Sequence, residues 1–465
     1  MTAIVWFRRD LRIHDNPTLA AACSRHRTLV PVFCLDPRLR NGPHRSPARD
    51  RFLLESLADL HRGLQALGSG LVLVEGRPEE LLSELAETLG AAEVFAAGDA
   101  GPFARRRDDR VATSLRVHDA TLQLTPGSFA VDDLSGIRTG TDGIYSVFTP
   151  FYKRWLNEPR RVVEDAPQEL APLPDTVRSI ATVKLHVESV DPTWPGGETA
   201  ARRRMHRFLG GAVDGYEDGH DSLGDPGTSA LSPYLHMGCI SPRELENLAP
   251  QNGGGDAFRR QLCWRDFYAY VLLHNPGNAR REHQRRYRRR IEWTNERELF
   301  DAWCEGRTGY PLVDAGMRQL DATGWMHNRA RMVVGSFLVK DLGVDWRWGE
   351  RWFMQKLIDG DEANNNGNWQ WIASVGVDTN PPQRRIYNPT LQQQRFDADG
   401  AYVRRWVPEL ARVPDRYLAE PWAMPPDVQS AVSCAIGEDY PEPVVDHAQA
   451  RREAIGRYAA AKGPN

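Results

Sequence analysis

The sequence predicts two domains of different class: an α/β domain with a doubly wound parallel sheet at the N-terminus, then a mainly α-helical domain. In the first quarter of the chain, short apolar runs alternate with helical segments, whereas from about residue 199 onward the apolar spacing is helical. A stretch rich in proline, glycine and acidic residues separates the two patterns and is typical of an interdomain connection. These observations place the domains at 1–127 and 199–465, with a linker over 128–198.

Four apolar runs near the N-terminus are typical of buried strands, at 3–7, 28–36, 70–76 and 93–99. The clearest helix between them is 49–67, which carries leucines along one face. This alternation predicts a parallel sheet covered by helices on both faces, with ligands beyond the carboxyl ends of the strands. No GxGxxG follows the first run, so a nicotinamide-type dinucleotide site is not indicated.

The composition is that of an ordinary globular protein, with 465 residues, 41% hydrophobic and 26% charged. The formal net charge is −3, so an anionic polymer would have to meet a local basic patch. The six cysteines form no CxxC pair, and we therefore expect no metal. No signal peptide or membrane-spanning run stands out, so we expect a cytoplasmic monomer that binds no membrane.

Two stretches in the helical half combine polar groups with a predicted helix. In GTSALSPYLHMGCIS (227–241), small hydroxyl residues can cap a helix, and helix N-termini also bind phosphates. In RRQLCWRDFYAY (259–270), a tryptophan shares one helix face with polar side chains, which suits stacking on a planar ligand such as a base. Simple capping and core packing are the alternative interpretations.

Tryptophans and charged groups cluster further along the chain. Nine of the fourteen tryptophans lie between Trp264 and Trp371, for which a tryptophan-rich core is the plain explanation. Arg331 could form a buried ion pair with a later carboxylate, and such pairs often line functional cavities. The decapeptide EANNNGNWQW (362–371) is unusual because asparagine is a poor helix former. Seven arginines over 280–290 predict either a solvated face or a phosphate-binding patch.

Together these stretches resemble the photolyase/cryptochrome family in order and spacing. Within that family the chain is similar to class I photolyases for cyclobutane pyrimidine dimers. The resemblance implies a deoxyribodipyrimidine photolyase, a carbon–carbon lyase that uses light and reduced FAD to transfer an electron to a dimer flipped out of damaged DNA. The motifs that carry it are VWFRRDLRIHDNPTL (5–19), FCLDP (33–37), GTSALSPYL (227–235), LCWRDFY (262–268), GRTGYPLVDAGMRQLDATGWMHNRARM (306–332) and SFLVKDLGVDWRWGERWFMQKLIDGD (336–361).

The resemblance also implies how FAD is bound in the helical domain. Phosphates would lie at Tyr216 and the loop 228–232, Arg331 and Asp359 would pair over the isoalloxazine, and Asp361 would bind its polar edge. Asn365 would face flavin N5, where an amide can accept or donate. The implied cofactor-binding residues are Tyr216, Thr228, Ser229, Ala230, Leu231, Ser232, Phe258, Arg331, Asp359, Gly360, Asp361 and Asn365.

Catalysis and DNA contact are implied for a further set. Trp369 matches the first member of an electron-transfer chain, followed by Trp346 and by Trp293 at the surface, while Trp303, Trp348 and Trp352 are interpreted as core or cavity wall. The implied catalytic residues are Asn365, Gln261, Trp264, Met332, Asn328, Trp369, Trp346 and Trp293. The implied DNA-binding residues are Gln261, Trp264, Arg265, Tyr268, Asn328, Arg329 and Trp371, with Trp264 and Trp371 as walls of the dimer pocket.

The N-terminal domain would hold an antenna chromophore. GDAGPFARRRDDR (98–110) lacks the Asn-Glu pair of folate-binding relatives and resembles relatives that bind 8-hydroxy-5-deazaflavin. Asp99 and Arg51 are the candidate contacts, and an empty or flavin-filled pocket stays open. The chain also departs from its branch at Gln261, where most relatives have glutamate.

The resemblance leaves two alternative functions. A photolyase for (6-4) photoproducts needs a histidine acid, and that branch has histidines where this chain has Asn328 and Met332. A cryptochrome-type blue-light photoreceptor signals through a flexible tail, and here only a short segment follows 417–426.

Overall fold

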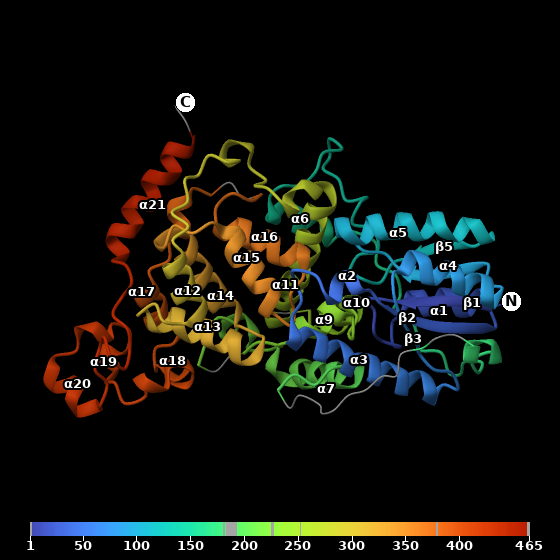
Figure 1. Ribbon diagram of the computed structural model, residues 1–465, viewed down its shortest axis with the longest axis horizontal. Coiled ribbons are helices and arrows are strands. Elements are labelled where there is room, and N and C mark those ends of the chain that lie inside the picture. Colours follow the sequence, from blue (N-terminus) through green and yellow to red (C-terminus); the bar gives the residue numbers. More distant parts are fainter. Residues whose placement is uncertain are drawn as a thin grey trace. The chain divides into compact units, whose positions relative to one another are not determined.

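The computed structural model describes residues 2–179, 182, 193–224, 227–251, 253–377 and 380–462. Its contacts divide the chain into two compact units (Figure 1). Unit 1 consists of Met1–Asp214, Ser229–Pro276 and Ile358–Ala363, and unit 2 of Gly215–Thr228, Gly277–Leu357 and Asn364–Asn465. The domain boundaries given above stay predictions, because these units follow contacts and are interleaved along the sequence.

Unit 1 contains the predicted parallel sheet, in the order β3-β2-β1-β4-β5. Four strands confirm the apolar runs, while the fifth was missed because an edge strand paired only with β4 needs no continuous apolar run. The order changes direction between β1 and β4, the position where doubly wound sheets bind ligands. The strands are β1 (Thr2–Phe7), β2 (Thr28–Leu35), β3 (Val72–Glu75), β4 (Glu93–Ala97) and β5 (Thr121–Thr125).

Helices cover both faces of this sheet (Figure 1). On one face, Ile4 and Trp6 of β1 pack in a cluster with apolar side chains of α4 (Pro78–Leu89) and α5 (Pro102–Leu115). Figure 1 shows α1 (Pro17–Arg25) and α3 (Pro47–Ala66) on the opposite side. The helix predicted over 49–67 is thus confirmed as part of α3, which begins at Pro47 after its N-cap, Ser46.

The rest of unit 1 is helical and includes the interdomain connection. The described part of 160–174 has no helix or strand, and most of 180–192 lies outside the described residues. The sequence 259–274 is helical, as predicted, and is part of α11. The helices of this region are α6 (Phe148–Trp155), α7 (Glu198–Arg207), α9 (Ser232–Met237), α10 (Pro242–Leu248) and α11 (Gly253–His274).

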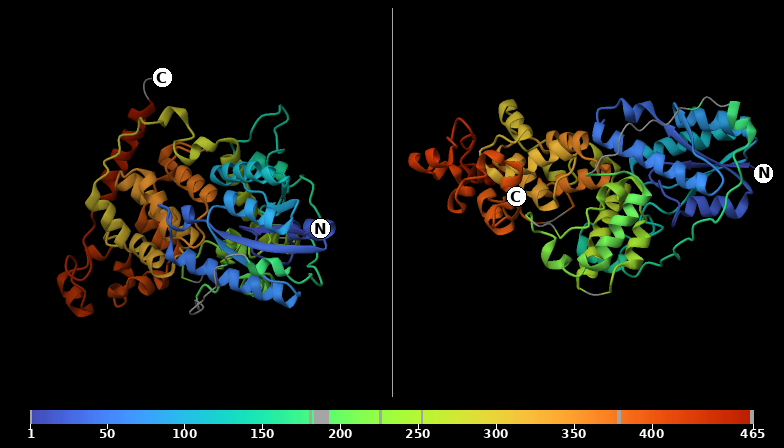
Figure 2. Two further views of the ribbon diagram at one scale, coloured as in Figure 1. Left: turned by 45° about the vertical axis from the view of Figure 1, so that its right-hand side comes forward. Right: turned by 90° about the horizontal axis from the view of Figure 1, so that it is seen from below.

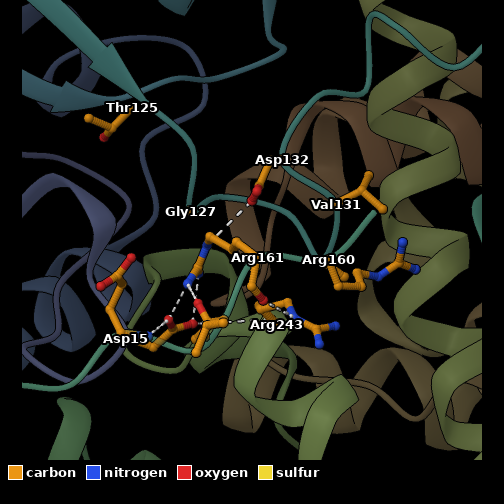
Figure 3. A network of polar contacts seen from close by, with 12 residues as sticks. Asp15, Thr125, Gly127, Val131, Asp132, Arg160, Arg161 and Arg243 are labelled. Carbon is orange, nitrogen blue, oxygen red and sulfur yellow. Dashed lines mark hydrogen bonds and ion pairs between the residues drawn. The ribbon is translucent and has the colours of Figure 1, made fainter. Parts of the chain in front are cut away.

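Buried charged side chains hold the start of the interdomain connection in place (Figure 3). The Arg161 guanidinium donates to Asp15 at 2.8 Å and lies 3.3 Å from the Asp132 carboxylate. Arg243 of α10 donates to the Arg161 carbonyl at 3.2 Å, and the Ser241 hydroxyl donates to Asp15. Because Asp15 is fully buried and accepts from several donors, the segment after α6 is fixed to the loop after β1.

Unit 2 is helical throughout its described regular structure, as predicted, and Figure 2 shows its yellow and orange helices packed side by side. Its core includes Trp303, Phe337, Trp346 and Trp369. Among the described residues, no helix combines the length and apolar character needed to cross a bilayer. The helices are α8 (Tyr216–Gly219), α12 (Arg297–Glu305), α13 (Pro311–Thr323), α14 (Asn328–Ser336), α15 (Trp346–Lys356), α16 (Glu362–Ile372, whose first two residues belong to unit 1), α17 (Pro389–Phe396), α18 (Ala401–Trp406), α19 (Asp415–Leu418), α20 (Pro426–Val432) and α21 (His447–Lys462).

Candidate active site

In unit 1, the loop before α9 meets a buried carboxylate. The Ser232 hydroxyl donates to Asp359 Oδ2 at 2.6 Å. Ala230 has a φ of 49°, which is rare for a residue with a Cβ and marks a strained loop of the kind found at ligand sites. The N-cap of α9 is Leu231 and no side chain caps this helix, so the predicted capping by the hydroxyl residues of this stretch is wrong; the Ser232 hydroxyl donates to Asp359 instead.

A second, partly buried carboxylate of unit 1, Asp361, forms an ion pair with an arginine. Arg9, which follows β1, forms an ion pair with Asp361 and lies 3.5 Å from Asp99. Its Nε also donates to the carbonyl of His236 at 3.0 Å. The His236 ring lies 4.0 Å from the Asp361 carboxylate, and burial lowers the pKa of this histidine well below its ordinary value. Sequence reasoning missed Arg9 as a site residue, although it lies in the first family motif, directly after β1.

The α11 face predicted to meet a base has its tryptophan stacked on one side. Trp264 is half-buried, and its ring lies parallel to Phe148 of α6 with centroids 3.6 Å apart. Tyr268 is buried, with its ring centroid 5.5 Å from that of Trp264, whereas Gln261 is exposed. Phe148 was missed because only tertiary packing brings α6 to this place. Phe258, one of the predicted cofactor residues, is buried against Phe208 at 4.9 Å.

Arg265 on the same helix faces the protein interior. Its guanidinium donates to the carbonyls of Ser128 at 2.7 Å and Leu235 at 3.3 Å. The neighbouring Asp266 accepts from Trp155 Nε1 at 3.0 Å, and burial raises the pKa of Asp266 to about 6. These bonds give Arg265 a structural role, and its contact with DNA stays a prediction.

In unit 2, α14 presents an amide and a thioether on one face. Asn328 Nδ2 lies 3.9 Å from Met332 Sδ, one helical turn away, and Asn328 is exposed. His327 next to it is buried, and its Nδ1 caps the helix by accepting from the N–H of Arg329 at 3.2 Å. Burial lowers the pKa of His327 to about 4. Arg331 donates to the Met326 carbonyl at 2.8 Å.

Arg329 is less free than the prediction of a phosphate contact assumed. Its guanidinium forms an ion pair with Asp221 and lies 4.2 Å from the ring centroid of Phe396. A phosphate contact there would compete with Asp221, and it stays a prediction.

The amides of α16 have separate tasks. Asn365 is buried, and its Nδ2 donates to the Glu350 carbonyl at 2.9 Å, so its amide oxygen is the atom offered to a ligand. Gln370 is buried as well; it accepts from the N–H of His283 at 2.8 Å and donates to Asn366 at 3.1 Å. The amide nitrogen of Asn365 is therefore used within the protein, whereas Asn366 accepts from Gln370 of the same helix.

Tryptophans of α15 and α16 pack in the core of unit 2. Trp369 lies 5.0 Å from Phe353 and 6.2 Å from Trp303, measured between ring centroids. A Cβ at Gly349 of α15 would lie 2.2 Å from the Trp369 ring, so only glycine lets the helices approach. Trp303 is fully buried, as a core residue should be, and its Nε1 donates to the Val334 carbonyl at 3.0 Å.

The other tryptophans of the predicted electron-transfer chain lie in different surroundings. Trp346 is buried beneath the Arg347 guanidinium, 4.9 Å from the ring centroid. Trp293 is half-buried, with its ring 6.4 Å from Tyr458. The Trp369–Trp346–Trp293 order stays a prediction.

Trp371 repeats the arrangement seen at Trp264. The Arg385 guanidinium covers the Trp371 ring, 3.7 Å from its centroid, and donates to the Trp371 carbonyl at 2.8 Å.

Tyr216, a predicted phosphate contact, is buried and stacks on His220, with ring centroids 5.1 Å apart. Burial raises the pKa of the Tyr216 phenol, which therefore stays neutral and can donate. The phosphate contacts of Tyr216, Thr228 and Ser229 and the flavin contact of Gly360 stay predictions.

Taken unit by unit, these groups fit an FAD. Unit 1 offers a strained hydroxyl-bearing loop, the buried carboxylate of Asp359 and the partly buried carboxylate of Asp361, each already bonded to a donor. Unit 2 offers a neutral amide oxygen whose orientation is fixed. Hydroxyls suit phosphates, and an acceptor oxygen suits a flavin N–H.

Comparisons with known proteins agree along the whole chain. Residues 3–174 match the family described as DNA photolyase, and residues 258–460 match the FAD binding domain of DNA photolyase. A deoxyribodipyrimidine photo-lyase of Streptomyces griseus is 42% identical over 473 residues, covering 99% of each chain.

Solved structures give the same result. A bacterial class III photolyase from Agrobacterium tumefaciens has a TM-score of 0.92 at 36% identity, covering 100% of this chain and 98% of that one. A cryptochrome of Synechocystis sp. PCC6803 has a TM-score of 0.87 at 30% identity, covering 98% of each. The chain therefore belongs to the DNA photolyase family, and it is an enzyme whose helical part is an FAD-binding domain.

Proposed function

We propose that this enzyme splits cyclobutane pyrimidine dimers in DNA under light, by electron transfer to a dimer flipped out of the duplex. Bound FAD, when reduced and excited by light, would supply the electron, and the electron would return after the ring opens, so that no net oxidation would occur. The protein binds and orients the two partners and keeps water away from them.

The charged groups of unit 1 and the amide of unit 2 are proposed to hold the flavin. Asp361, oriented by Arg9, would bind the polar edge of the ring system, and Asp359, oriented by Ser232, is proposed as a further flavin contact; the pairing of Asp359 with Arg331 stays a prediction. Because the Asn365 Nδ2 donates to the Glu350 carbonyl, the oxygen of Asn365 would be the atom that accepts a hydrogen bond from flavin N5–H. Because Asn365 is neutral, it does not force one charge state on the ring.

The proposed selection of the dimer rests above all on the exposed Asn328 and the partly buried Met332. The amide can bond a pyrimidine carbonyl, and the thioether can pack on the saturated ring. Repair of a (6-4) photoproduct needs a histidine acid at these positions. His327, the nearest histidine on this helix, is buried, neutral and occupied as a helix cap. This supports dimer repair over (6-4) repair.

A blue-light photoreceptor is the second candidate, supported by the similarity to the Synechocystis cryptochrome. One assay separates the three functions. Protein purified with its flavin is mixed with oligonucleotides that contain a single cyclobutane dimer or a single (6-4) product, in light and in darkness. We expect restored pyrimidines only from the dimer and only in light. Equal repair in darkness, repair of the (6-4) product alone, or no repair by flavin-loaded protein would each contradict the proposal.

Trp369, Trp346 and Trp293 are proposed to pass an electron inward from the surface, because indoles are the most easily oxidised aromatic side chains here. The burial of Trp369 and Trp346 and the partial exposure of Trp293 support this direction.

An antenna chromophore, 8-hydroxy-5-deazaflavin, is proposed for the N-terminal sheet. Asp99 follows β4 at the position where the strand order changes direction, and it accepts from the N–H of Gly101 at 3.1 Å. Arg51 is exposed on α3. Mass spectrometry of chromophores released from protein made in a deazaflavin-producing host identifies the occupant; a folate, a second flavin or an empty site would contradict the proposal.

A further inference from the structure

The arginine-rich stretch 280–290 takes no part in the site described above. In the described part of the chain, none of its exposed guanidinium groups forms an ion pair. Other arginines of unit 2 do: Arg297 pairs with Asp301 at 2.8 Å, and Arg404 with Asp415 at 2.6 Å. The exposed residues, called the arginine surface below, are Arg280, Arg281, Arg285, Arg286, Arg289 and Arg290.

The backbone beneath the arginine surface is fixed by inward-facing side chains. Tyr287 is 1% exposed and packs against Tyr458 with ring centroids 5.7 Å apart, and Ile291 is buried as well. Arg288, the one arginine that turns inward, donates to the carbonyl of Glu282 at 2.8 Å and to that of His283 at 3.3 Å. Because the backbone beneath the arginine surface is fixed, binding a ligand would not have to order it.

Helix α16 provides the main anchor. Gln370 accepts from the N–H of His283 at 2.8 Å and donates to the carbonyl of Arg281 at 3.2 Å. Gln284 bonds the segment just beyond α16, with its N–H donating to the Val375 carbonyl at 2.9 Å. The arginine surface is therefore in a fixed position relative to Trp371, which α16 carries one residue after Gln370.

Uncompensated arginines in a protein of net charge −3 point to a polyanion. Solubility does not require them, and the exposed acid at the end of the stretch, Glu292, balances only one of the charges. Guanidinium groups bond phosphate oxygens well. We propose that the arginine surface binds the sugar–phosphate backbone of duplex DNA outside the dimer pocket, independently of damage.

This contact would act before repair. Phosphate contacts give sequence-independent affinity and let a protein move along DNA. The proposal rests on the proposed function only in taking DNA as the polymer. It concerns binding to undamaged duplex in darkness, so it can fail or hold whether or not light-driven repair is observed.

The test compares charge-matched variants of the full-length, flavin-loaded protein. The surface variant is R280Q/R285Q/R286Q/R290Q; Arg289 is kept because its φ is 55°. The control, R297Q/R307Q/R412Q/R416Q, removes the same number of exposed arginines elsewhere in unit 2. A third variant changes the four surface arginines to lysine, which keeps the charge. The probe is an undamaged duplex of about 20 base pairs, roughly two helical turns. Fluorescence anisotropy measures Kd for this duplex at salt concentrations from about 50 to 200 mM.

The surface variant should bind undamaged duplex about tenfold or more weakly, and its salt slope should fall by about 3 to 4, because each lost phosphate contact removes about 0.9. The control and lysine variants should stay near the parent. Repair at saturating dimer should be unchanged, because these arginines do not touch reacting groups. Equal losses in surface and control variants, or an unchanged salt slope, would overturn the proposal. Polyglutamate serves as a second probe, a model of an acidic protein. If the surface variant loses binding to polyglutamate but keeps its binding to DNA, the arginine surface binds an acidic protein instead.

Discussion

Helices α11 and α16 carry similar residue types but are held very differently. Each has an amide and a tryptophan whose ring is covered on one side, by Phe148 for Trp264 and by Arg385 for Trp371. On α16 the amides of Asn365 and Gln370 are buried and bonded to other segments. On α11, by contrast, Gln261 is exposed and its side chain makes no hydrogen bond within the described residues.

This difference in burial and hydrogen bonding is what we expect if one helix orients a bound cofactor and the other receives a substrate. Groups that orient a permanently bound cofactor can be locked when the protein folds, at no cost to turnover. Groups that receive a substrate must be open until it arrives, so their polar atoms face water in the free protein. Changes on α16 should therefore reduce stability first, and changes on the open face of α11 should reduce binding with little change in stability.

The largest effect is expected at Gln370. Gln370→Leu leaves the His283 N–H and the carbonyls of Asn278 and Arg281 without their partner in a buried place. Unfolding free energy should fall by about 2–4 kcal/mol, measured by denaturant titration. Asn368→Ala on the exposed side of the same helix is the control and should change it by less than about 0.5 kcal/mol. Equal, small effects would mean that α16 is not locked.

Gly349→Ala should come next. The added methyl group would meet Trp369 at 2.2 Å and Leu338 at 2.6 Å, so α15 and α16 must move apart. Overpacking of this kind costs about 1–3 kcal/mol. Gly456→Ala, in α21 with no heavy atom within 4 Å of the new methyl, should be neutral or stabilising by up to about 1 kcal/mol. Thermal unfolding of both proteins distinguishes crowding at Trp369 from a general effect of alanine.

Glu362, the first residue of α16, should make stability depend on pH. Burial, with the charges of Asp361 and Asp99, raises its pKa to about 7. The folded state thus favours the protonated acid, and stability is lost as pH rises from about 4.5 to 7. Glu362→Gln should match the parent near pH 4.5 and be more stable by about 1–2 kcal/mol at pH 8. A difference that is constant from pH 4.5 to 8 would contradict the raised pKa.

The smallest effect on stability is expected at Gln261. Gln261→Leu should change unfolding free energy by less than about 0.5 kcal/mol, because the residue is exposed. Affinity for a dimer-containing oligonucleotide should nevertheless fall by about 1–3 kcal/mol, since dimer polar groups lose a donor and an acceptor. Gln261→Glu should repair with a yield that falls as the pH rises and the carboxyl ionises. If Gln261→Leu binds and repairs like the parent, the residue lies outside the pocket.

Periodic patterns predicted much of the fold. The four buried runs of the sheet and the leucine stripe of α3 repeat at the spacing of their own element, so they can be found locally. β5 was missed because TLQLT pairs on one side only and is not fully buried. The asparagines of α16 are poor helix formers, and the helix is supported by bonds such as those of Gln370 to residues near 280.

The site was less predictable than the fold. Motifs gave Asn365 and Asp361 by resemblance, but the residues that orient them, Glu350 through its carbonyl and Arg9 through its side chain, come from other segments. The stacking of Phe148 on Trp264 is also a tertiary contact. Residue spacing within a single sequence cannot predict partners that come from distant segments of the chain.

The central claim is that the open face of α11 receives the dimer, and Trp264→Ala tests it most directly. In darkness, Kd is measured for one oligonucleotide with and without a single cyclobutane dimer, using flavin-loaded parent and variant. Loss of a stacked base partner costs about 1–3 kcal/mol, so the preference for damaged DNA should fall about 5- to 150-fold, with Kd for undamaged DNA unchanged. An unchanged preference in a variant that still holds its flavin would contradict this account.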